Sequence, residues 1–293
     1  NLGKNVREGA HYTQFMVYDF DGNGRAEIIA KTADGTIDGQ GRVIGDPAAS
    51  WASPAGSTIS WTRRGEVVQS STEGHILKGP EFLTVFDGRT GAALATTDYV
   101  PGRHPETHSP TPEQLFETWG DPVGNRSDRY LAAVAYLDGQ RPSVIMARGY
   151  YTRTVLAAWD WRDGKLTQRW IFDSQDGTEG NLAYRGQGNH GISVADVDGD
   201  GRDEIIYGAA VIDDNGKGLY STGRGHGDAQ HTSDLDPSRP GLETYSIHEN
   251  PRHEHGINLR DARTGELYWS KPSPDIGRGL AADIDPRHPG AEY

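Results

Sequence analysis

The chain has 293 residues, of which 42 are acidic and 29 are basic, so its formal net charge is −13. This acidity disfavours nucleic acids and anionic membrane surfaces as partners, and the absence of cysteine excludes disulfide frameworks, thiol nucleophiles and cysteine-based metal sites. The 39 glycines and seven tryptophans, in a chain with only 34% hydrophobic residues, indicate a turn-rich globular protein, and no apolar run approaches the ~18 residues that a membrane helix needs.

Five segments repeat one pattern: an apolar strand, an acidic pair or its remnant, a turn and a second strand. They span residues 17–29, 135–145, 194–206, 234–243 and 283–292. Between them, glycine-containing turns predict hairpins at residues 86–91, 161–165, 213–217 and 260–265. The acidic pairs of the last three copies begin 38 and then 49 residues apart, which suits four short strands per unit of about 40 to 50 residues. We therefore predict an all-β chain with the architecture of a β-propeller.

One helix is expected, over Thr111–Trp119, with Thr111 as its N-cap and Pro112 as its first helical residue. It lies in a long insertion from about Pro101 to Arg129, and a second long connection runs from Asp38 to Thr72. On a propeller, insertions of this length either build the walls of a binding face or form disordered surface loops. The sequence leaves both possibilities open.

Two of the repeats carry oxygen ligands at alternating positions, with glycines that allow the loop to curl around one ion. The ligand sets are Asp19, Asp21, Asn23, Arg25 and Glu27 in the first loop and Asp196, Asp198, Asp200, Arg202 and Glu204 in the second, each arginine offering its backbone carbonyl. Hard oxygen donors in a flexible loop select Ca²⁺. An EF-hand would need glutamate three residues further on, where Ala30 and Tyr207 stand, so we predict strand–loop–strand calcium loops that mainly hold the fold together.

Two further copies of the loop contain proline. They carry the pairs Asp234 with Asp236 and Asp283 with Asp285. These copies either bind Ca²⁺ more weakly or are simple turns.

A separate set of histidines and acidic residues lies around His190, His226, Asp228 and Glu249. Together these side chains suggest a mixed nitrogen and oxygen metal site, although any one of the histidines alone is more often an ordinary loop residue. The sequence lacks H-E-x-x-H, G-x-S-x-G and Walker A motifs, which argues against zincin, serine hydrolase and nucleotide-dependent chemistry.

Several segments resemble those of bacterial rhamnogalacturonan lyases, polysaccharide lyase family 11, in order and over essentially the whole chain. They are residues 9–15, 31–36, 147–153, 186–190 and 275–286. The resemblance implies an eight-bladed, calcium-loaded propeller, secreted and monomeric, that cleaves the rhamnose–galacturonic acid backbone of pectin rhamnogalacturonan I. Because family segments upstream and downstream have no counterpart here, we expect residues 1–293 to be an incomplete portion of one catalytic propeller domain.

The resemblance also implies residue roles. His190, His226, Asp228 and Glu249 would help to hold a Ca²⁺ ion near the cleft, and Arg278 would face the galacturonate of the substrate. β-Elimination must remove the C5 proton and stabilise charge that spreads into the C6 carboxylate, and we expect Ca²⁺ and Arg278 to supply the positive charge.

The general base is not identified, because the family's candidate lysine lies in a downstream segment that has no counterpart here. His11 and Arg153 are nominated by position and chemistry alone. Tyr150 and Tyr151 either stack on rhamnose or, as we favour, pack between blades. A non-catalytic alternative is an integrin-like propeller for adhesion or carbohydrate binding, which uses similar calcium loops but does not need the histidine, carboxylate and arginine set.

Overall fold

The structure is a computed structural model that describes the chain except residues 8, 10, 250–254 and 276. The chain divides into two compact units. Unit 1 comprises Asn1–Ala132, Met146–Gly149 and Trp159–Arg169, and unit 2 comprises Ala133–Ile145, Tyr150–Ala158 and Trp170–Tyr293. Among the described residues, no helix has the length and apolar character needed to cross a membrane.

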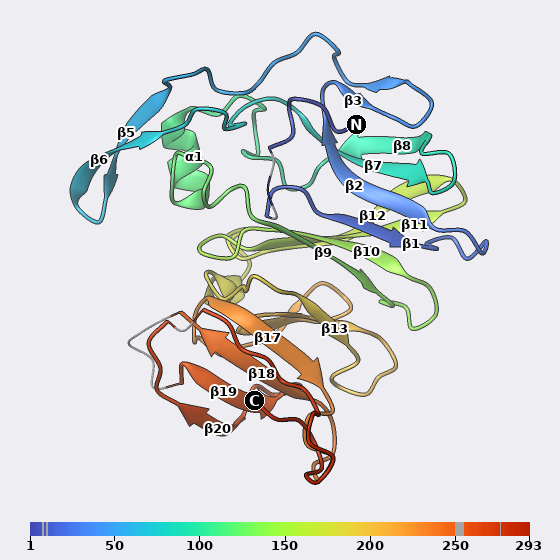
Figure 1. The fold of residues 1–293 in the computed structure, drawn as a ribbon, viewed down its shortest axis with the longest axis vertical. Coiled ribbons are helices and arrows are strands. Elements are labelled where there is room, and N and C mark those ends of the chain that lie inside the picture. The colour runs from blue at the N-terminus through green and yellow to red at the C-terminus, as the bar shows by residue number, and fades with distance from the viewer. Residues whose placement is uncertain (8, 10, 250–254, 276) are drawn as a thin grey trace. The chain divides into compact units, whose positions relative to one another are not determined.

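Unit 1 contains a four-stranded antiparallel sheet and two short hairpins (Figure 1). The sheet has the order β1 (Phe15–Tyr18), β2 (Glu27–Ala33), β7 (Glu81–Asp87) and β8 (Ala93–Asp98). The hairpins are β3 (Thr36–Ile37) with β4 (Val43–Ile44) and β5 (Thr58–Arg63) with β6 (Glu66–Ser71). Both hairpins therefore lie inside the long connection between β2 and β7.

Three more four-stranded sheets follow along the chain. The first contains β9 (Tyr130–Ala135), β10 (Ser143–Arg148), β11 (Val155–Arg162) and β12 (Lys165–Asp173), and its residues are divided between the two units. In unit 2, one antiparallel sheet contains β13 (Ser193–Ala195), β14 (Glu204–Tyr207), β15 (Ala210–Ile212) and β16 (Gly218–Ser221). The other contains β17 (Gly227–Ser233), β18 (Glu243–His248), β19 (Ile257–Asp261) and β20 (Leu267–Lys271).

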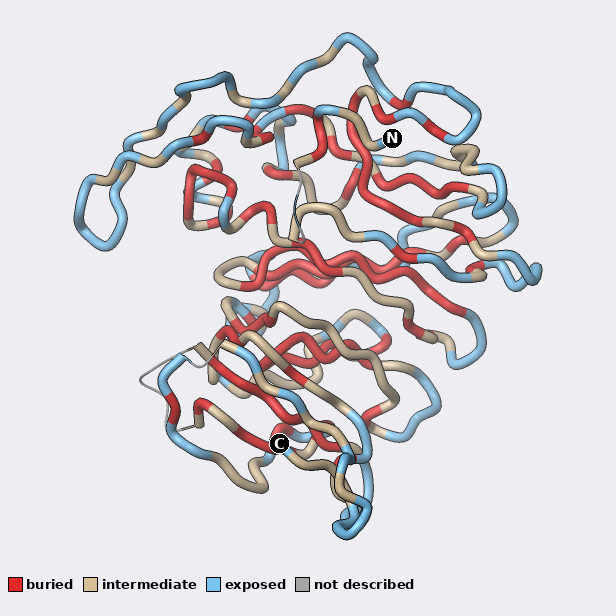
Figure 2. The backbone as a smooth tube through the Cα atoms, in the orientation of Figure 1, coloured by how far each residue is buried: buried red, intermediate tan, exposed pale blue. Residues whose placement is uncertain are grey.

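The prediction of an all-β chain is confirmed, since the helices that the described residues form are only α1 (Pro112–Trp119) and the 3₁₀ turn η1 (Asn181–Tyr184). Figure 2 shows that burial is concentrated in the central strands of the sheets, while the loops that join them are exposed. All six residues of β10 are buried, whereas β8 alternates between half-buried and exposed positions. This difference follows the usual contrast between a central strand and a strand with one solvated face.

The four predicted hairpin turns are confirmed, and they join β7 to β8, β11 to β12, β15 to β16 and β19 to β20. The turn after β7 shows why its sequence forms this structure. Asp87 Oδ1 accepts hydrogen bonds from the Arg89 and Thr90 amides and from the Thr90 hydroxyl, and Gly91 takes the positive φ of 67° that closes the turn. The turn after β19 repeats the same bonds around Asp261.

Helix α1 begins as predicted, with a capping box at its N-terminus. Thr111 Oγ1 accepts from the Gln114 amide at 3.2 Å, and Gln114 Oε1 accepts from the Thr111 amide at 2.9 Å. The helix ends at Gly120, whose φ of 90° is accessible without strain only to glycine. Its buried face carries Leu115 and Trp119.

A buried cluster of charges ties the insertion from Pro101 to Arg129 to the sheet of unit 1. Glu81 on β7 contacts Lys31 Nζ at 3.1 Å, Arg103 at 3.0 Å and Arg148 at 2.7 Å. Asp128 lies 3.7 Å from Arg103 and 3.6 Å from Arg148. Each of these five residues is at most 4% exposed, so the three cations and two carboxylates depend on one another for charge compensation.

The charges of this cluster control the protonation of Glu81. Burial alone would raise the pKa of Glu81, but the positive charges of Arg103, Arg148 and Lys31 outweigh burial and hold its pKa well below the usual value. Burial lowers the pKa of Lys31, and Glu81 opposes that change. Glu81 is therefore ionised whenever unit 1 is folded near neutral pH.

We predict that Glu81→Gln lowers the free energy of unfolding by about 3 to 5 kcal/mol at neutral pH, because it leaves three buried cations facing one carboxylate. Since the folded pKa of Glu81 is depressed, its contribution is present above the unfolded pKa and is lost as pH falls through the folded pKa. Denaturant unfolding from pH 7 to pH 3 measures both effects, and the variant should show a smaller loss on acidification than the parent.

The matched control is Glu66→Gln, which changes an exposed glutamate of the β5–β6 hairpin. It should alter the unfolding free energy by less than about 0.5 kcal/mol. Equal effects of the two substitutions would show that the buried cluster does not stabilise unit 1.

Candidate metal centre

Four side chains from separate segments of unit 2 converge on one point. His190, His226, Asp228 and Glu249 each offer one ligand atom, and the four atoms all lie within 4.8 Å of one another. His226 and Asp228 stand at the start of β17, and Glu249 directly follows its neighbour β18. His190 precedes β13, where its amide donates to the Gly227 carbonyl at 3.2 Å. Strand pairing thus brings together residues that are far apart in sequence.

His226 is held in one orientation by the backbone. Its Nδ1 lies 2.7 Å from the Gly188 carbonyl, and because a carbonyl only accepts, Nδ1 carries the proton. Nε2 then points at Glu249 Oε1, 3.4 Å away. This contact is favourable only if Nε2 is also protonated or if a cation lies between the two groups, so the geometry calls for positive charge at this point.

His190 is held by two tyrosines. Its Nδ1 lies 2.9 Å from the Tyr150 hydroxyl and its Nε2 lies 3.3 Å from the Tyr151 hydroxyl. The Tyr150 ring is fully buried and stacks on His226 with centroids 5.0 Å apart and planes 12° apart. Both imidazoles are therefore fixed by aromatic packing and hydrogen bonds, which is how ligand rings are oriented in metal sites.

The backbone at Gly188 has no room for a side chain. A Cβ there would lie 2.5 Å from Tyr150 Cβ and 2.7 Å from Tyr207 Cε1. The Gly188 carbonyl, which accepts from His226, can reach its position only because this residue is glycine.

The pKa values of the two carboxylates of the cluster shift in opposite directions. Burial, followed by the charge of Glu249, raises the pKa of Asp228. The hydrogen bond with His226 lowers the pKa of Glu249. His190 Nε2 lies 3.1 Å from Asp228 Oδ1, so each carboxylate has an imidazole partner.

Arg278 lies beside the cluster. Its NH1 donates to the Asp228 carbonyl at 2.6 Å and lies 3.3 Å from Asp228 Oδ1. The arginine side chain is 66% exposed while that of Asp228 is 13% exposed, so the guanidinium stands at the solvent side of the carboxylates. An anionic ligand that approaches from solvent would meet it.

The two candidates for the general base lie outside this cluster. His11 belongs to unit 1, and its carbonyl accepts from the Tyr130 amide at 3.0 Å. Arg153 belongs to unit 2 and forms a two-pronged contact with Asp173, with Nε to Oδ1 at 3.1 Å and NH2 to Oδ2 at 2.5 Å.

The two predicted calcium loops have the same internal hydrogen bonds. In the first, Asp19 accepts from the Gly22, Asn23 and Gly24 amides. In the second, Asp196 accepts from the Gly199, Asp200 and Gly201 amides. Each loop gathers three potential ligand atoms within 4.8 Å: Asp19, Asp21 and Glu27 in the first, and Asp196, Asp198 and Glu204 in the second.

The remaining candidates of these loops contact their own neighbours. Asn23 Nδ2 donates to Asp21 Oδ2 at 3.0 Å, and Asp200 Oδ1 accepts from the Arg202 amide at 2.9 Å. Arg25 occupies the same position in the first loop as Arg202 does in the second. Both arginines are exposed to solvent. The guanidinium of Arg202 contacts Asp214 Oδ2 at 2.9 Å.

Glu204 links the second loop to residues that the sequence did not identify as candidates. Its ligand atom also lies within 4.8 Å of one oxygen each from Asp213 and Asp214, in the turn after β15. Burial raises the pKa of Glu204 to about 8, and among the described residues its Oε1 has no hydrogen-bond partner. The register of β14 with β15 places this turn beside the loop. No local motif encodes that register, so Asp213 and Asp214 could not be recognised from the sequence.

The proline-containing copies differ from these loops by an arginine. Arg239 Nε lies 2.8 Å from Asp236 Oδ2, and Arg287 Nε lies 2.8 Å from Asp285 Oδ1. Asp234 lies two residues before Asp236, and Asp283 lies two residues before Asp285. Within the described part of the chain, neither copy gathers three potential ligand atoms. A guanidinium here neutralises the carboxylate that a cation would otherwise contact.

Comparison with known proteins identifies the family. The model described as rhamnogalacturonan lyase family 11, C-terminal domain, matches residues 1–293. The chain belongs to rhamnogalacturonan lyase family 11. The resemblance noted from the sequence is thereby confirmed.

Curated members of the lyase family share more than half of their aligned residues with this chain. It is 56% identical over 292 residues to rhamnogalacturonan exolyase YesX of Bacillus subtilis (strain 168), covering 99% of this chain and 43% of that protein. Rhamnogalacturonan endolyase YesW of the same organism is 54% identical over 293 residues, covering 100% of this chain and 42% of that protein. The chain thus spans less than half the length of these relatives.

Solved structures of family members agree with the fold. A crystal structure of exotype lyase YesX matches with a TM-score of 0.87 and 55% identity, over 99% of this chain and 43% of that one. Bacillus licheniformis rhamnogalacturonan lyase PL11 matches with a TM-score of 0.87 and 57% identity, over 99% of this chain and 45% of that one.

We predict that Gly188→Ala weakens divalent metal binding at the His190–Glu249 cluster by about 10- to 100-fold, because the new Cβ displaces the carbonyl that orients His226. Calorimetric titration of the chelated protein with Ca²⁺ measures this change. The matched control is Gly191→Ala, whose nearest neighbour is Gln230 Cγ at 4.0 Å, and it should bind like the parent. Unchanged affinity in Gly188→Ala would contradict the assigned role of the Gly188 carbonyl.

Proposed function

We propose that the protein containing this chain is a calcium-dependent rhamnogalacturonan lyase that cleaves the backbone of rhamnogalacturonan I by β-elimination at galacturonate. One observation carries the proposal: in a chain of the lyase family, the atoms of His190, His226, Asp228 and Glu249 converge within 4.8 Å, and Arg278 contacts Asp228 at their solvent side. The non-catalytic adhesion alternative would give this arrangement no purpose.

The donor set fits a divalent cation. Two carboxylates supply hard oxygens and negative charge, and His226 presents Nε2 toward Glu249 with its proton fixed on Nδ1. Carboxylates suit Ca²⁺, whereas two imidazoles are also common ligands of Zn²⁺. The metal test therefore compares both ions.

The chain's own residues contribute binding, orientation and proton control. Arg278 has a planar guanidinium that can donate hydrogen bonds to both oxygens of the C6 carboxylate of galacturonate and so position C5 for proton removal. Tyr150 and Tyr151 keep His190 in place through their hydroxyls, and Tyr150 also keeps His226 in place by stacking. When bound, a divalent cation would stabilise the negative charge that develops on the C6 carboxylate.

A general base must accept the C5 proton. Arginine is protonated at all ordinary pH values, and Arg153 is paired with Asp173. An imidazole titrates near neutral pH, so His11 is the first of the two candidates to test.

We also propose that the four four-stranded sheets are successive blades of a β-propeller, eight-bladed in the family, of which residues 1–293 form an incomplete portion. Two features support this proposal: the strands of each sheet follow chain order, and the Ala282–Glu292 bridge has the form of a further repeat. The loops 19–27 and 196–204 would each hold a structural Ca²⁺ ion. Because the substrate is a large polysaccharide outside the cell, the enzyme would be secreted and would act there as a monomer.

We predict that the full-length protein, incubated with rhamnogalacturonan I and Ca²⁺, produces the ultraviolet absorbance of an unsaturated uronate. Arg278→Ala should lower the rate by about 100-fold, because it removes a charge-assisted contact to the substrate carboxylate. The matched control is Arg287→Ala, which removes an exposed arginine that also pairs with an aspartate, and it should retain the parent rate. No absorbance from the parent protein would refute the lyase proposal, and full activity of Arg278→Ala would refute only that residue's role.

We further predict that chelation abolishes this activity and that added Ca²⁺ restores it. Chelation should also lower the melting temperature, because the acidic loops then carry uncompensated carboxylates. If Zn²⁺ restores activity and Ca²⁺ does not, the proposed metal site is supported but its assignment to Ca²⁺ is wrong. In His226→Ala, restoration should require about tenfold more Ca²⁺ or more.

A further inference from the structure

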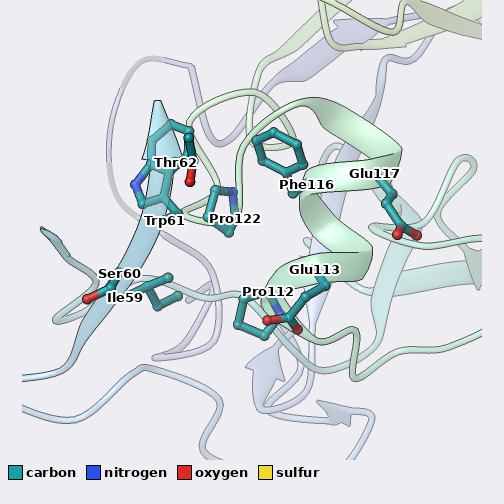
Figure 3. A pocket seen from close by; sticks show the side chains of 9 residues that line it. All are labelled: Ile59, Ser60, Trp61, Thr62, Pro112, Glu113, Phe116, Glu117 and Pro122. Carbon is teal, nitrogen blue, oxygen red and sulfur yellow. The ribbon is translucent and has the colours of Figure 1, made fainter. Parts of the chain in front are cut away.

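The two long insertions of unit 1 together line an open pocket of about 340 Å³. One wall is strand β5, through Ile59, Ser60, Trp61 and Thr62, and the other is helix α1 with the proline-rich segments at its ends. Figure 3 shows Trp61 and Ile59 on the strand side, Phe116, Glu113 and Pro112 on the helix side, and Pro122 between them. The volume lies within the range of small-ligand pockets, about 300 to 1,000 Å³.

The aromatic rings of this pocket are rigidly held yet accessible. The Trp61 indole Nε1 donates to Ser70 Oγ at 3.0 Å, which fixes the ring against β6. Trp61 and Phe116 meet edge to face, with centroids 6.2 Å apart and planes 62° apart. Because Phe116 lines an open pocket, it remains 44% exposed. An exposed, fixed aromatic pair of this kind offers a stacking face at little entropic cost.

The negative charge of the pocket favours neutral ligands over anionic ones. Its two ionisable residues, Glu113 and Glu117, are exposed on α1 and both are acidic. Hydrogen bonds from its own backbone and from Thr111 lower the pKa of Glu113, so this carboxylate is charged at neutral pH. Carboxylates accept hydrogen bonds from hydroxyl groups and repel uronates and phosphates. Aromatic faces beside hydroxyl acceptors suit the apolar and polar sides of a sugar ring.

We propose that this pocket binds a neutral saccharide residue, with the ring stacked on Trp61 and Phe116 and its hydroxyls donating to Glu113 and Glu117. A second cavity of about 410 Å³ shares Ile59, Pro112 and Pro122 with the first and is also lined by Trp51 and Lys78. Because the two cavities share three lining residues, we infer that they are parts of one groove, in which two carboxylates outnumber one cation and which takes an oligosaccharide or a polysaccharide segment, not a single sugar. The site is built entirely from unit 1, whereas the His190–Glu249 cluster belongs to unit 2.

The test uses the full-length protein and two probes of equal length, neutral galactotetraose and acidic tetragalacturonate. Galactotetraose contains no carboxylate and is not a substrate for β-elimination, so its binding is independent of the lyase proposal. Tryptophan fluorescence and saturation-transfer NMR measure affinity and show which protons touch the rings. The expected result is that Trp61→Ala weakens galactotetraose binding at least tenfold but changes by less than twofold the binding of tetragalacturonate, which the proposed substrate site also binds.

Three variants make the result specific. Trp61→Phe should recover most of the affinity, since it keeps a stacking face. Val67→Ala, at a residue 78% exposed on the same hairpin but outside the pocket, should bind like the parent. The double variant Glu113→Gln with Glu117→Gln should bind galactotetraose more weakly, because a neutral amide accepts a hydrogen bond from a hydroxyl less strongly than a carboxylate does, and it should bind tetragalacturonate more tightly.

Clear outcomes would overturn the proposal. These are equal affinity of the parent and Trp61→Ala for galactotetraose, with both folded by circular dichroism, or a larger effect of Trp61→Ala on the binding of tetragalacturonate than on that of galactotetraose. Sedimentation that shows Trp61-dependent dimers without saccharide binding would assign the groove to self-association instead. None of these results bears on the ultraviolet assay of the lyase, so failure here and failure there are distinguishable.

Discussion

In four of the five acidic repeats, the closing glutamate makes the hydrogen bond on which the local fold depends. Glu27 Oε2 accepts from the Phe20 amide, Glu204 Oε2 from Val197, Glu243 Oε2 from Leu235, and Glu292 Oε2 from Ile284, all at 2.8 to 3.0 Å. A carboxylate on the second strand thus satisfies a backbone donor of the loop, so strand, loop and strand form one unit. Three of these glutamates, Glu27, Glu204 and Glu243, are buried, so the negative charge of each loop needs a compensating positive charge.

The copies meet this requirement in two ways. In the loops around Asp19 and Asp196, two aspartates and the glutamate gather their oxygens in one place, where a divalent cation would relieve their repulsion. In the copies around Asp236 and Asp285, an arginine of the turn donates a hydrogen bond to the carboxylate of that aspartate instead. The proline-containing copies thus compensate an aspartate with an arginine of the chain itself, whereas the loops around Asp19 and Asp196 would need an external cation for the same purpose.

The candidate metal centre and the aromatic groove depend on different constraints. The metal centre is positioned by the pairing of β17 with β18 and by a close backbone approach at Gly188. The groove is positioned by Glu81, which attaches the insertion containing Arg103 to β7, and by the Trp119 indole, which donates to the Arg103 carbonyl at 2.7 Å. Paired strands thus fix the metal cluster, whereas the groove takes its side chains from β5 and α1, which the long insertions contribute.

The sequence by itself determined the elements whose causes are local. The capping box at Thr111, the aspartate-centred turns at Asp87 and Asp261, and the curled loops after Asp19 and Asp196 each follow from contacts within a few residues. The resemblance to the lyase family also selected the residues of the metal centre. Only the tertiary structure decided how they meet: that His226 is oriented by Gly188, that the turn with Asp213 and Asp214 adjoins Glu204, and that the two long insertions together line an open pocket. These contacts join segments from about ten to more than fifty residues apart, and strand register and burial, which set them, leave no local pattern in the chain.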